Sequence, residues 1–365
     1  MRFFHENRIP LINILAAALG VFFLGTNAAG QKLSPPQFNR PGNTLIADQF
    51  NNRVIEVDPE GKIVWQFGKG PADFSPASII GTNDAQRVGP LTLMAGTGTP
   101  GGQPEAPNCT NPNGCPDNRV LLVNPAGHII WQYGQFGVTG NGPDQLSTPV
   151  QNTWLPDRHV LITDQGNGRI IEVRVSDKAI VWEYDGLNNP NCAELLQNGN
   201  ILICDENNNQ ALEVTHTPTI PTKIVHTYTM AGGMPFSFVA FASRLSNGHT
   251  LITDSGNARI VETDEAGDVF FQYFTNTDPA SNPRCSNTCT GPLPTRAVRL
   301  HNGNTLISDQ YNHRVIEVDP QGDIVHTFGK INSLGYDTQS VADGGLNSPY
   351  DAKHIGDYTG ITSPF

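Results

Sequence analysis

The sequence contains few charged residues, and the basic ones are the scarcer kind. Among 365 residues there are 22 Lys and Arg against 34 Asp and Glu, which gives a formal net charge of −12. Proteins bind phosphate backbones mainly through Lys and Arg, and the sequence shows no stripe of basic residues. The composition therefore argues against a nucleic-acid partner, whereas a cation or a cationic ligand is compatible with this charge.

Short catalytic motifs are also missing. The sequence has no G-x-S-x-G, no H-E-x-x-H and no phosphate-binding loop, so it names no nucleophile, zinc protease site or nucleotide site. It has neither C-x-x-C nor C-x-x-C-H, which are the spacings of redox and haem sites. Whether the protein is an enzyme is left open by the sequence.

Only one hydrophobic run is long enough to matter for membranes. Residues 9–24 are apolar, Arg2 and Arg8 precede them, and the small residues Ala28, Ala29 and Gly30 follow. This pattern predicts a signal peptide over residues 1–29, or alternatively an uncleaved N-terminal anchor. The mature domain is then 30–365. We expect an exported protein that is periplasmic, extracellular or at the cell surface, with no membrane contact beyond that possible anchor.

All six cysteines follow the predicted signal peptide, and an even count in an exported chain indicates disulfides. Two pairs each lie within a single loop, and the third pair flanks a turn with Asn and Gly. Local proximity predicts the disulfides Cys109–Cys115, Cys192–Cys204 and Cys285–Cys289.

What the sequence does contain is one phrase repeated six times. The clearest copies are residues 43–68, NTLIADQFNNRVIEVDPEGKIVWQFG, and residues 304–329, NTLISDQYNHRVIEVDPQGDIVHTFG. Four further copies lie between them. A period of roughly 40 to 50 residues is the signature of a repeat architecture. A residue present in every copy is then expected to be structural, and a residue that breaks the pattern is a candidate for function.

Each copy divides into four short strands, called A to D in order. In the last copy, strands are predicted over residues 296–300, 305–308, 314–318 and 323–328, separated by turn sequences. With no helical period anywhere, the sequence predicts an all-β fold, a six-bladed β-propeller of four-stranded antiparallel blades. The first copy lacks a good strand A. Residues 348–355 match 293–300 in spacing, so the C-terminal strand is predicted to close the ring in blade one.

The phrase over residues 48–68 resembles NHL-type repeats, and the flanking GNTLIAD (residues 42–48) is similar to the propeller repeats of bacterial arylsulfotransferases. The resemblance covers nearly the whole mature chain and implies the propeller fold. Such propellers serve as enzymes, sensor domains and binding platforms. Arylsulfotransferase-like and amidating-lyase-like propellers use active-site histidines. Here His354 and His301 are nearest to the inner-strand ends, but both fall toward the A–B turns.

Two columns of charged residues recur at the loops between strands B and C. One reading is a ring of acids for metal binding. The favoured interpretation is structural, because Asp orders loops through backbone hydrogen bonds and Arg can pair with it. The Asp column comprises Asp48, Asp164, Asp205, Asp254 and Asp309, and the Arg column Arg53, Arg119, Arg169, Arg259 and Arg314. Strand D carries an aromatic column, in which His226 and His326 are interpreted as packing or surface residues.

The irregular segments gather on one side of the predicted ring. B–C loops and D–A links emerge on one face, which we call the loop-rich face, and A–B and C–D turns on the other, the turn face. The segments 96–117, 134–148, 275–293 and 329–347 all belong to the loop-rich face. Loops on a rigid scaffold commonly carry function, so this face is expected to bind and the turn face to be inert.

A second set of candidates lies where strand A begins, at the channel mouth on the loop-rich face. Carboxylates and amides that converge there can hold Ca²⁺, a polar ligand or ordered water. The candidates are Asn83, Asp84, Gln151, Asn152, Asn191, Arg296, Tyr350 and Asp351, with the apolar Phe241 in the same position of its blade. We therefore expect an exported propeller that binds a protein or a small polar ligand through the loop-rich face. The alternatives are a propeller lyase, hydrolase or sulfotransferase with its site at the channel mouth, and a structural surface protein.

Overall fold

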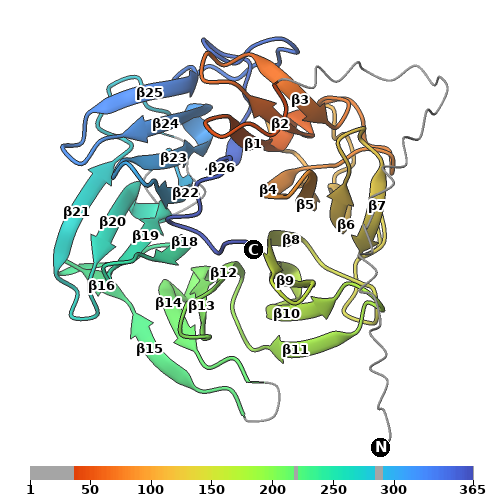
Figure 1. The fold of residues 1–365 in the computed structure, drawn as a ribbon. Helices are drawn as coiled ribbons and strands as arrows, with labels where there is room; N and C mark the ends of the chain where they lie inside the picture. The colour runs from red at the N-terminus through yellow and green to blue at the C-terminus, as the bar shows by residue number, and fades with distance from the viewer. Residues whose placement is uncertain (1–36, 218–220, 284–290, 365) are drawn as a thin grey trace, which may run out of the picture. The chain divides into compact units, whose positions relative to one another are not determined.

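In a computed structural model, residues 37–217, 221–283 and 291–364 are described, and they form six four-stranded antiparallel sheets arranged as blades around a ring (Figure 1). The predicted six-bladed β-propeller is confirmed. Within the described residues, no helix is long and apolar enough to cross a membrane.

The first three blades follow the chain from the outside of blade one to blade three. Blade one consists of β26 (Pro349–His354), β1 (Thr44–Asp48), β2 (Arg53–Val57) and β3 (Ile63–Phe67). Blade two consists of β4 (Thr82–Val88), β5 (Leu91–Thr99), β6 (Cys115–Val123) and β7 (Ile129–Tyr133). Blade three consists of β8 (Pro149–Leu155), β9 (His159–Asp164), β10 (Arg169–Arg174) and β11 (Ile180–Tyr184).

The other three blades repeat the same order from the inner strand outward. Blade four consists of β12 (Pro190–Leu195), β13 (Ile201–Asp205), β14 (Gln210–Val214) and β15 (Ile224–Tyr228). Blade five consists of β18 (Val239–Arg244), β19 (Thr250–Asp254), β20 (Arg259–Thr263) and β21 (Val269–Phe274). Blade six consists of β22 (Pro294–Arg299), β23 (Thr305–Asp309), β24 (Arg314–Val318) and β25 (Ile324–Gly329). A small hairpin, β16 (Met230–Ala231) with β17 (Met234–Pro235), links blades four and five.

The C-terminal strand closes the ring, as predicted from its spacing. β26 pairs antiparallel with β1, so that Thr44 lies opposite His354 and Ile46 opposite Ala352. The first and last parts of the chain therefore share one sheet, and the innermost strand of blade one comes from the C-terminus (Figure 1).

The hydrophobic core lies between neighbouring blades. Leu45 and Val54 of blade one, for example, share a buried cluster with Met94 and Leu121 of blade two. The aromatic column of strand D joins blades as well: the indole N–H of Trp65 donates to the carbonyl of Pro125 in the next blade at 3.0 Å. Large flat side chains thus fill the space between twisted sheets, which confirms the packing interpretation of this column.

The B–C loops are held by the Asp column. In blade one, Asp48 accepts a hydrogen bond from the backbone N–H of Asn347 at 2.8 Å, and its other oxygen accepts from Asn51 and Arg53, each at 2.8 Å. Asp48 and Arg53 are both 0% exposed. The Asp therefore ties its loop to the link that precedes its own inner strand, and the structural interpretation of both columns is confirmed. The loops contain one-turn 3-10 helices: η1 (Gln49–Asn51), η2 (Gln165–Asn167), η3 (Glu206–Asn208), η4 (Ser255–Asn257) and η5 (Gln310–Asn312).

Blade two departs from this pattern and repairs it. The place of the column Asp is taken by Gly96, which lies opposite Arg119. The missing carboxylate comes from Asp117 on the neighbouring strand, which bonds to Arg119 and accepts from the backbone N–H of Ile80 at 2.8 Å. A Cβ on Gly96 would lie 2.4 Å from an oxygen of Asp117. Gly96 is therefore required so that Asp117 can enter.

A second set of ion pairs fastens each blade to the next, and the sequence reasoning missed it. A Glu on strand C reaches a cationic side chain on the inner strand of the following blade. Glu56 pairs with Arg87 at 2.6 Å, Glu213 with Arg244 at 2.7 Å, Glu262 with Arg299 at 3.0 Å and Glu317 with His354 at 3.6 Å. We call these the inter-blade Glu pairs. The repeated Glu in VIEV, ALEV and IVET was the available signal.

Two of the three predicted disulfides are present. Cys109–Cys115 staples the loop after β5, and Cys192–Cys204 joins opposed residues of β12 and β13. The predicted Cys285–Cys289 lies outside the described residues.

The long segments are not all confined to the loop-rich face. Strands β5 and β6 extend into the segment 96–117 as a stapled hairpin, which we call the stapled hairpin loop (residues 100–114). Within the link 329–347, however, the carbonyl of Gln339 accepts from Ile63, and the N–H of Val341 donates to the carbonyl of Gly61 at 2.7 Å. This part of the link pairs beside a C–D turn, so the expectation that it lies on the loop-rich face is wrong.

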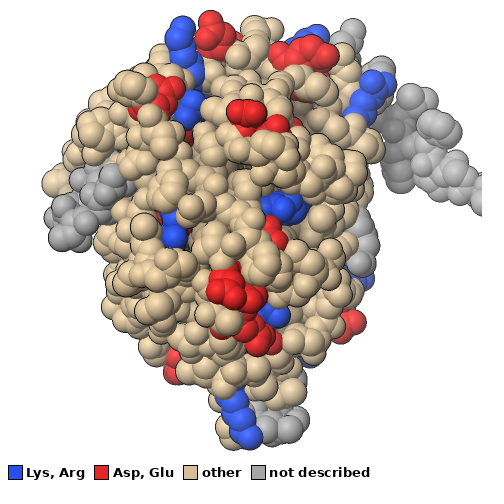
Figure 2. Space-filling view, turned by 90° about the vertical axis from the view of Figure 1, so that its left-hand side faces the viewer, with Lys and Arg blue, Asp and Glu red and all other residues tan. Residues whose placement is uncertain are grey.

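The outer strands carry apolar side chains to the surface. Viewed from the side of blades five and six, charged residues are scattered over a mostly uncharged surface, with no basic stripe on this side (Figure 2). The exposed apolar side chains of these blades' outer strands include Val269, Phe270, Ile324 and Val325.

Candidate functional site

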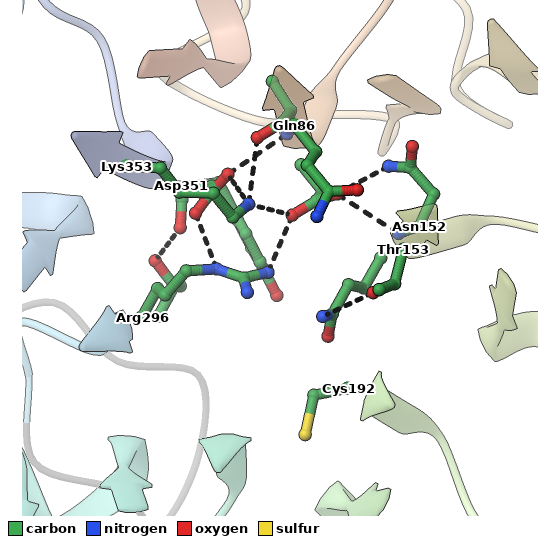
Figure 3. A network of polar contacts seen from close by, with 12 residues as sticks. Gln86, Asn152, Thr153, Cys192, Arg296, Asp351 and Lys353 are labelled. Carbon is green, nitrogen blue, oxygen red and sulfur yellow. Dashed lines mark hydrogen bonds and ion pairs between the residues drawn. The ribbon is translucent and has the colours of Figure 1, made fainter. Parts of the chain in front are cut away.

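The innermost strands bring most of the predicted site residues to the central channel. Arg296 on β22 pairs with Asp84 on β4 at 3.0 Å and with Asp351 on β26 at 2.7 Å (Figure 3). Lys353, which the sequence reasoning missed, pairs with the same two carboxylates at 2.7 and 2.5 Å. We call these four residues, Asp84, Arg296, Asp351 and Lys353, the channel network.

The channel network is buried and electrically balanced. Its two acids and two bases are each at most 6% exposed. Burial raises the pKa of Asp84 to about 6, although the charges of Lys353 and Arg296 oppose it. Burial also acts to raise the pKa of Asp351, but Arg296 and Lys353 outweigh it and hold that pKa below its usual value. The network therefore satisfies its own charges and is a structural joint between blades one, two and six.

Calcium does not fit these residues. The positions that a cation would take beside Asp84 and Asp351 are filled by the side chains of Arg296 and Lys353. Among the described residues, no group of three or more His, Cys, Asp or Glu side chains could hold a metal ion. A metal at this level of the channel would face two cations at close range.

The other predicted residues are divided among several small contacts. Asn152 donates to Asp84 at 2.6 Å and so extends the channel network to blade three (Figure 3). Asn83 accepts from Gln49 at 2.8 Å. Phe241 lies under the guanidinium of Arg296, 4.2 Å from ring centre to carbon. These residues are packed into the scaffold rather than directed at an open site.

Gln151 belongs to the turn-face end of the channel. Its amide donates to Glu194 at 2.6 Å, and Glu194 also accepts from the backbone N–H of Thr362 at 2.8 Å. Gln86 donates to the carbonyl of Thr362 at 3.1 Å. The C-terminal tail (residues 356–364) thus crosses the channel end, and the C-terminus lies at the centre of the ring in Figure 1.

Asn191 and Tyr350 meet at the opposite end, beside a residue that the sequence reasoning missed. The amide of Asn191 and the hydroxyl of Tyr350 exchange hydrogen bonds at 3.0 and 3.1 Å. Next to them, Glu206 of η3 accepts from Asn189 at 2.6 Å. Burial raises the pKa of Glu206 to about 7 against the effect of hydrogen bonds from Asn191 and Asn189. No ion pair joins Glu206 to a cation within the described residues.

A sequence signal for Glu206 existed. The residue that follows each column Asp is Gln49, Gln165, Glu206, Ser255 or Gln310. Only blade four places an acid there. By the rule that a break in the repeat marks a candidate for function, Glu206 should have been selected.

The stapled hairpin loop lies over the same end of the channel. Its Gln103 contacts the hydroxyl of Tyr311 in blade six at 3.3 Å, and the carbonyl of Glu105 accepts from Asn347 at 2.8 Å. Asn108 donates to the carbonyl of Pro71 at 3.3 Å. A loop of blade two is therefore anchored to the segments around blades one and six, which fixes its shape.

The two histidines considered from the resemblance are tied to structural partners. His354 lies 3.6 Å from Glu317, and burial lowers its pKa. His301 lies 2.8 Å from Asp357 of the tail. Both are at the turn-face ends of inner strands, as the sequence indicated, and no nucleophile accompanies either in these contacts.

No family model matches the chain, and no curated protein matches it in sequence. Solved structures do resemble it. A Bacteroides caccae protein of unknown function is 14% identical with a TM-score of 0.53, covering 80% of this chain and 97% of that one. A chain of a nidogen/laminin complex is 13% identical with a TM-score of 0.50, covering 78% and 92%. Virginiamycin B lyase from Staphylococcus aureus is 17% identical with a TM-score of 0.45, covering 69% and 70%. These likenesses show the fold alone.

Proposed function

We propose that the protein is an exported propeller that binds a protein partner through its loop-rich face, with Glu206 receiving a cationic group of that partner. The observation that carries the proposal is the contrast between the two sets of charges. The channel network is closed on itself. Glu206 is a partly buried acid with amide donors but no cationic partner in the described part of the chain. A lysine, arginine or amine group would supply the missing charge.

The stapled hairpin loop supports a binding surface at the same place. It is held by a disulfide and by contacts to Tyr311 and Asn347. A loop that is ordered before the partner arrives pays less conformational entropy on binding. Export is consistent with the two disulfides, which persist in oxidising compartments.

The test compares matched variants in cross-linking capture from the native source, with quantitative mass spectrometry. One variant is Glu206→Gln, and its control is Gln165→Ala at the same position of blade three. A second replaces residues 100–114 by Asn-Gly and Cys115 by Ser, and its control is Gln321→Ala on a turn of the opposite face. We expect the same captured protein to be lost from both test variants and kept by both controls. Equal capture by all four would refute the proposal.

The pH dependence sharpens the test. Because the pKa of Glu206 is about 7, its carboxyl is charged above and neutral below that value. Affinity for a cationic group is therefore expected to rise between about pH 6 and pH 8 in the unaltered protein and to stay flat in Glu206→Gln. The partner's own titration is controlled by measuring both proteins against the same preparation.

One observation also favours the enzyme alternative. A carboxyl with a pKa near 7 beside the Tyr350 hydroxyl has the properties of a general acid or base at the channel mouth. Turnover of a candidate substrate by the unaltered protein that Glu206→Gln abolishes, with captured partners unchanged, would select this alternative.

A further inference from the structure

The turn face, which the repeat pattern predicts to be inert, contains a cavity of about 610 Å³. It lies between the A–B turns of blades four and five and the C-terminal tail. Its volume is within the range of small-molecule sites. It is independent of Glu206 and opens at the other end of the propeller.

The walls of the cavity are largely apolar. Leu195, Leu196 and Leu245 come from the inner strands and turns of the two blades, and Tyr358 and Ile361 come from the tail. Leu196 and Leu245 are each 7% exposed. A hydrocarbon or aromatic body would therefore meet a preformed surface on two sides.

Two hydrogen-bond donors line this apolar space without full use. Ser243 is 2% exposed, and its hydroxyl has no hydrogen-bond partner in the described residues. Beside it, Arg244 uses Nε on Thr250 and Nη2 on Glu213 and Tyr228. Those contacts leave its Nη1 without a hydrogen bond among the described residues. An unpaired buried hydroxyl is costly unless something supplies a partner.

The acid that lines the cavity is already occupied. One oxygen of Glu194 accepts from Gln151 at 2.6 Å, and the other accepts from the N–H and hydroxyl of Thr362 at 2.8 and 2.5 Å. Glu194 therefore has no spare oxygen with which to attract an amine. The lining offers donors and lacks acceptors, so it favours a ligand that carries an acceptor group.

We propose that this cavity binds a small organic acid, with its carboxylate at Ser243 and Arg244 and its apolar body against Leu195, Leu245 and Ile361. The tail forms one wall, so the ligand also bridges the chain end to blades four and five. Carboxylates take charge-assisted hydrogen bonds from Arg, which are stronger than neutral ones. The apolar body supplies the hydrophobic part of the affinity.

The test uses three probes with the full mature chain: 3-phenylpropanoate, octanoate and the cation 3-phenylpropylamine. Ligand-observed NMR and calorimetry at neutral pH measure binding. We expect at least one acid to bind more tightly than about 1 mM and the amine to bind at least about tenfold more weakly. Equal affinity for the acids and the amine, or no binding of either acid at that level, would overturn the proposal.

Two variants locate the site. Ser243→Ala removes the unpaired hydroxyl, so the melting temperature is expected to be unchanged or higher while affinity for the acid falls about fivefold or more. Ser246→Trp places a large side chain on an exposed turn that lines the cavity, and it is expected to block binding. Gln321→Trp on a C–D turn is the control and should bind like the unaltered chain. Unchanged affinity in both test variants would place the acid elsewhere and overturn the proposal.

Discussion

Removing Arg296 from the channel network gives the most direct test of how the ring is held. Arg296→Met leaves Asp84 and Asp351 buried with Lys353 as their one remaining cation. Breaking a buried ion pair from one side costs about 3–5 kcal/mol of unfolding free energy. Unfolding of roughly 330 residues releases ~0.7 kcal/mol per degree of entropy, so the melting temperature is expected to fall by roughly 4–7 °C.

The loss should depend on pH in a defined direction. Without Arg296, the folded-state pKa of Asp84, already raised to about 6, moves further up. A carboxyl with a raised folded pKa stabilises the fold at pH values below its unfolded pKa and loses that contribution as pH rises through the folded one. The destabilisation is therefore expected to be largest near pH 8 and smaller near pH 5.

Calorimetry or circular dichroism of three proteins makes this comparison. The control is Arg174→Met, which breaks an exposed pair to Asp177 at 3.0 Å and should cost less than about 0.5 kcal/mol. Arg296→Met combined with Asp84→Asn should recover at least half of the loss, because one uncompensated charge is removed with its partner. If Arg296→Met melts like Arg174→Met, or its deficit is the same at both pH values, the account of the network is wrong.

Four further predictions concern the scaffold. Deleting residues 348–365 removes the closing strand and should cost more than the about 3–5 kcal/mol of one broken buried pair; a truncated protein that melts like the full chain would contradict ring closure. Gly96→Ala should cost about 1–3 kcal/mol by overpacking, measured by denaturant unfolding against Gly142→Ala, whose neighbour is the flexible end of a side chain. Non-reducing peptide mapping is expected to recover Cys285–Cys289 beside the two disulfides present, and a long-range pair would contradict it. The inter-blade Glu pairs have carboxyls whose pKa is held low in blades four to six, so their stabilisation is present above about pH 4.5 and lost as pH falls through the folded values; an acid titration of stability that stays flat below about pH 4.5 would argue against them.

The fold could be predicted because each copy of the repeat states it again. Alternation in strands such as residues 314–318 and the Asp-Pro-x-Gly turn after them are local signals, and six copies correct one another. The closing strand was also readable, because its spacing to Pro349 matches the spacing to Pro294 in the preceding copy. Local sequence and global topology agree, as expected of a repeat protein.

The candidate site was less readable, because its partners meet only across the ring. Asp84, Arg296 and Asp351 were selected from their positions on inner strands, but their mutual pairing depends on the distance across the channel. Lys353 was missed because it lies two residues beyond the expected mouth, and β26 brings it to the same carboxylates. Long-range contacts of this kind leave no trace in local spacing.

The breaks in the repeat have opposite meanings, and only the partners of each residue distinguish them. Gly96 breaks the Asp column, yet Asp117 restores the same carboxylate to the same Arg, so the break is compensated and carries no function. Glu206 breaks the Gln-rich column beside it, and no cation compensates it among the described residues. A substitution that the scaffold repairs is neutral for activity, whereas one left without a partner retains its capacity to bind. That difference, rather than irregularity alone, is what selects Glu206 as the residue to test first.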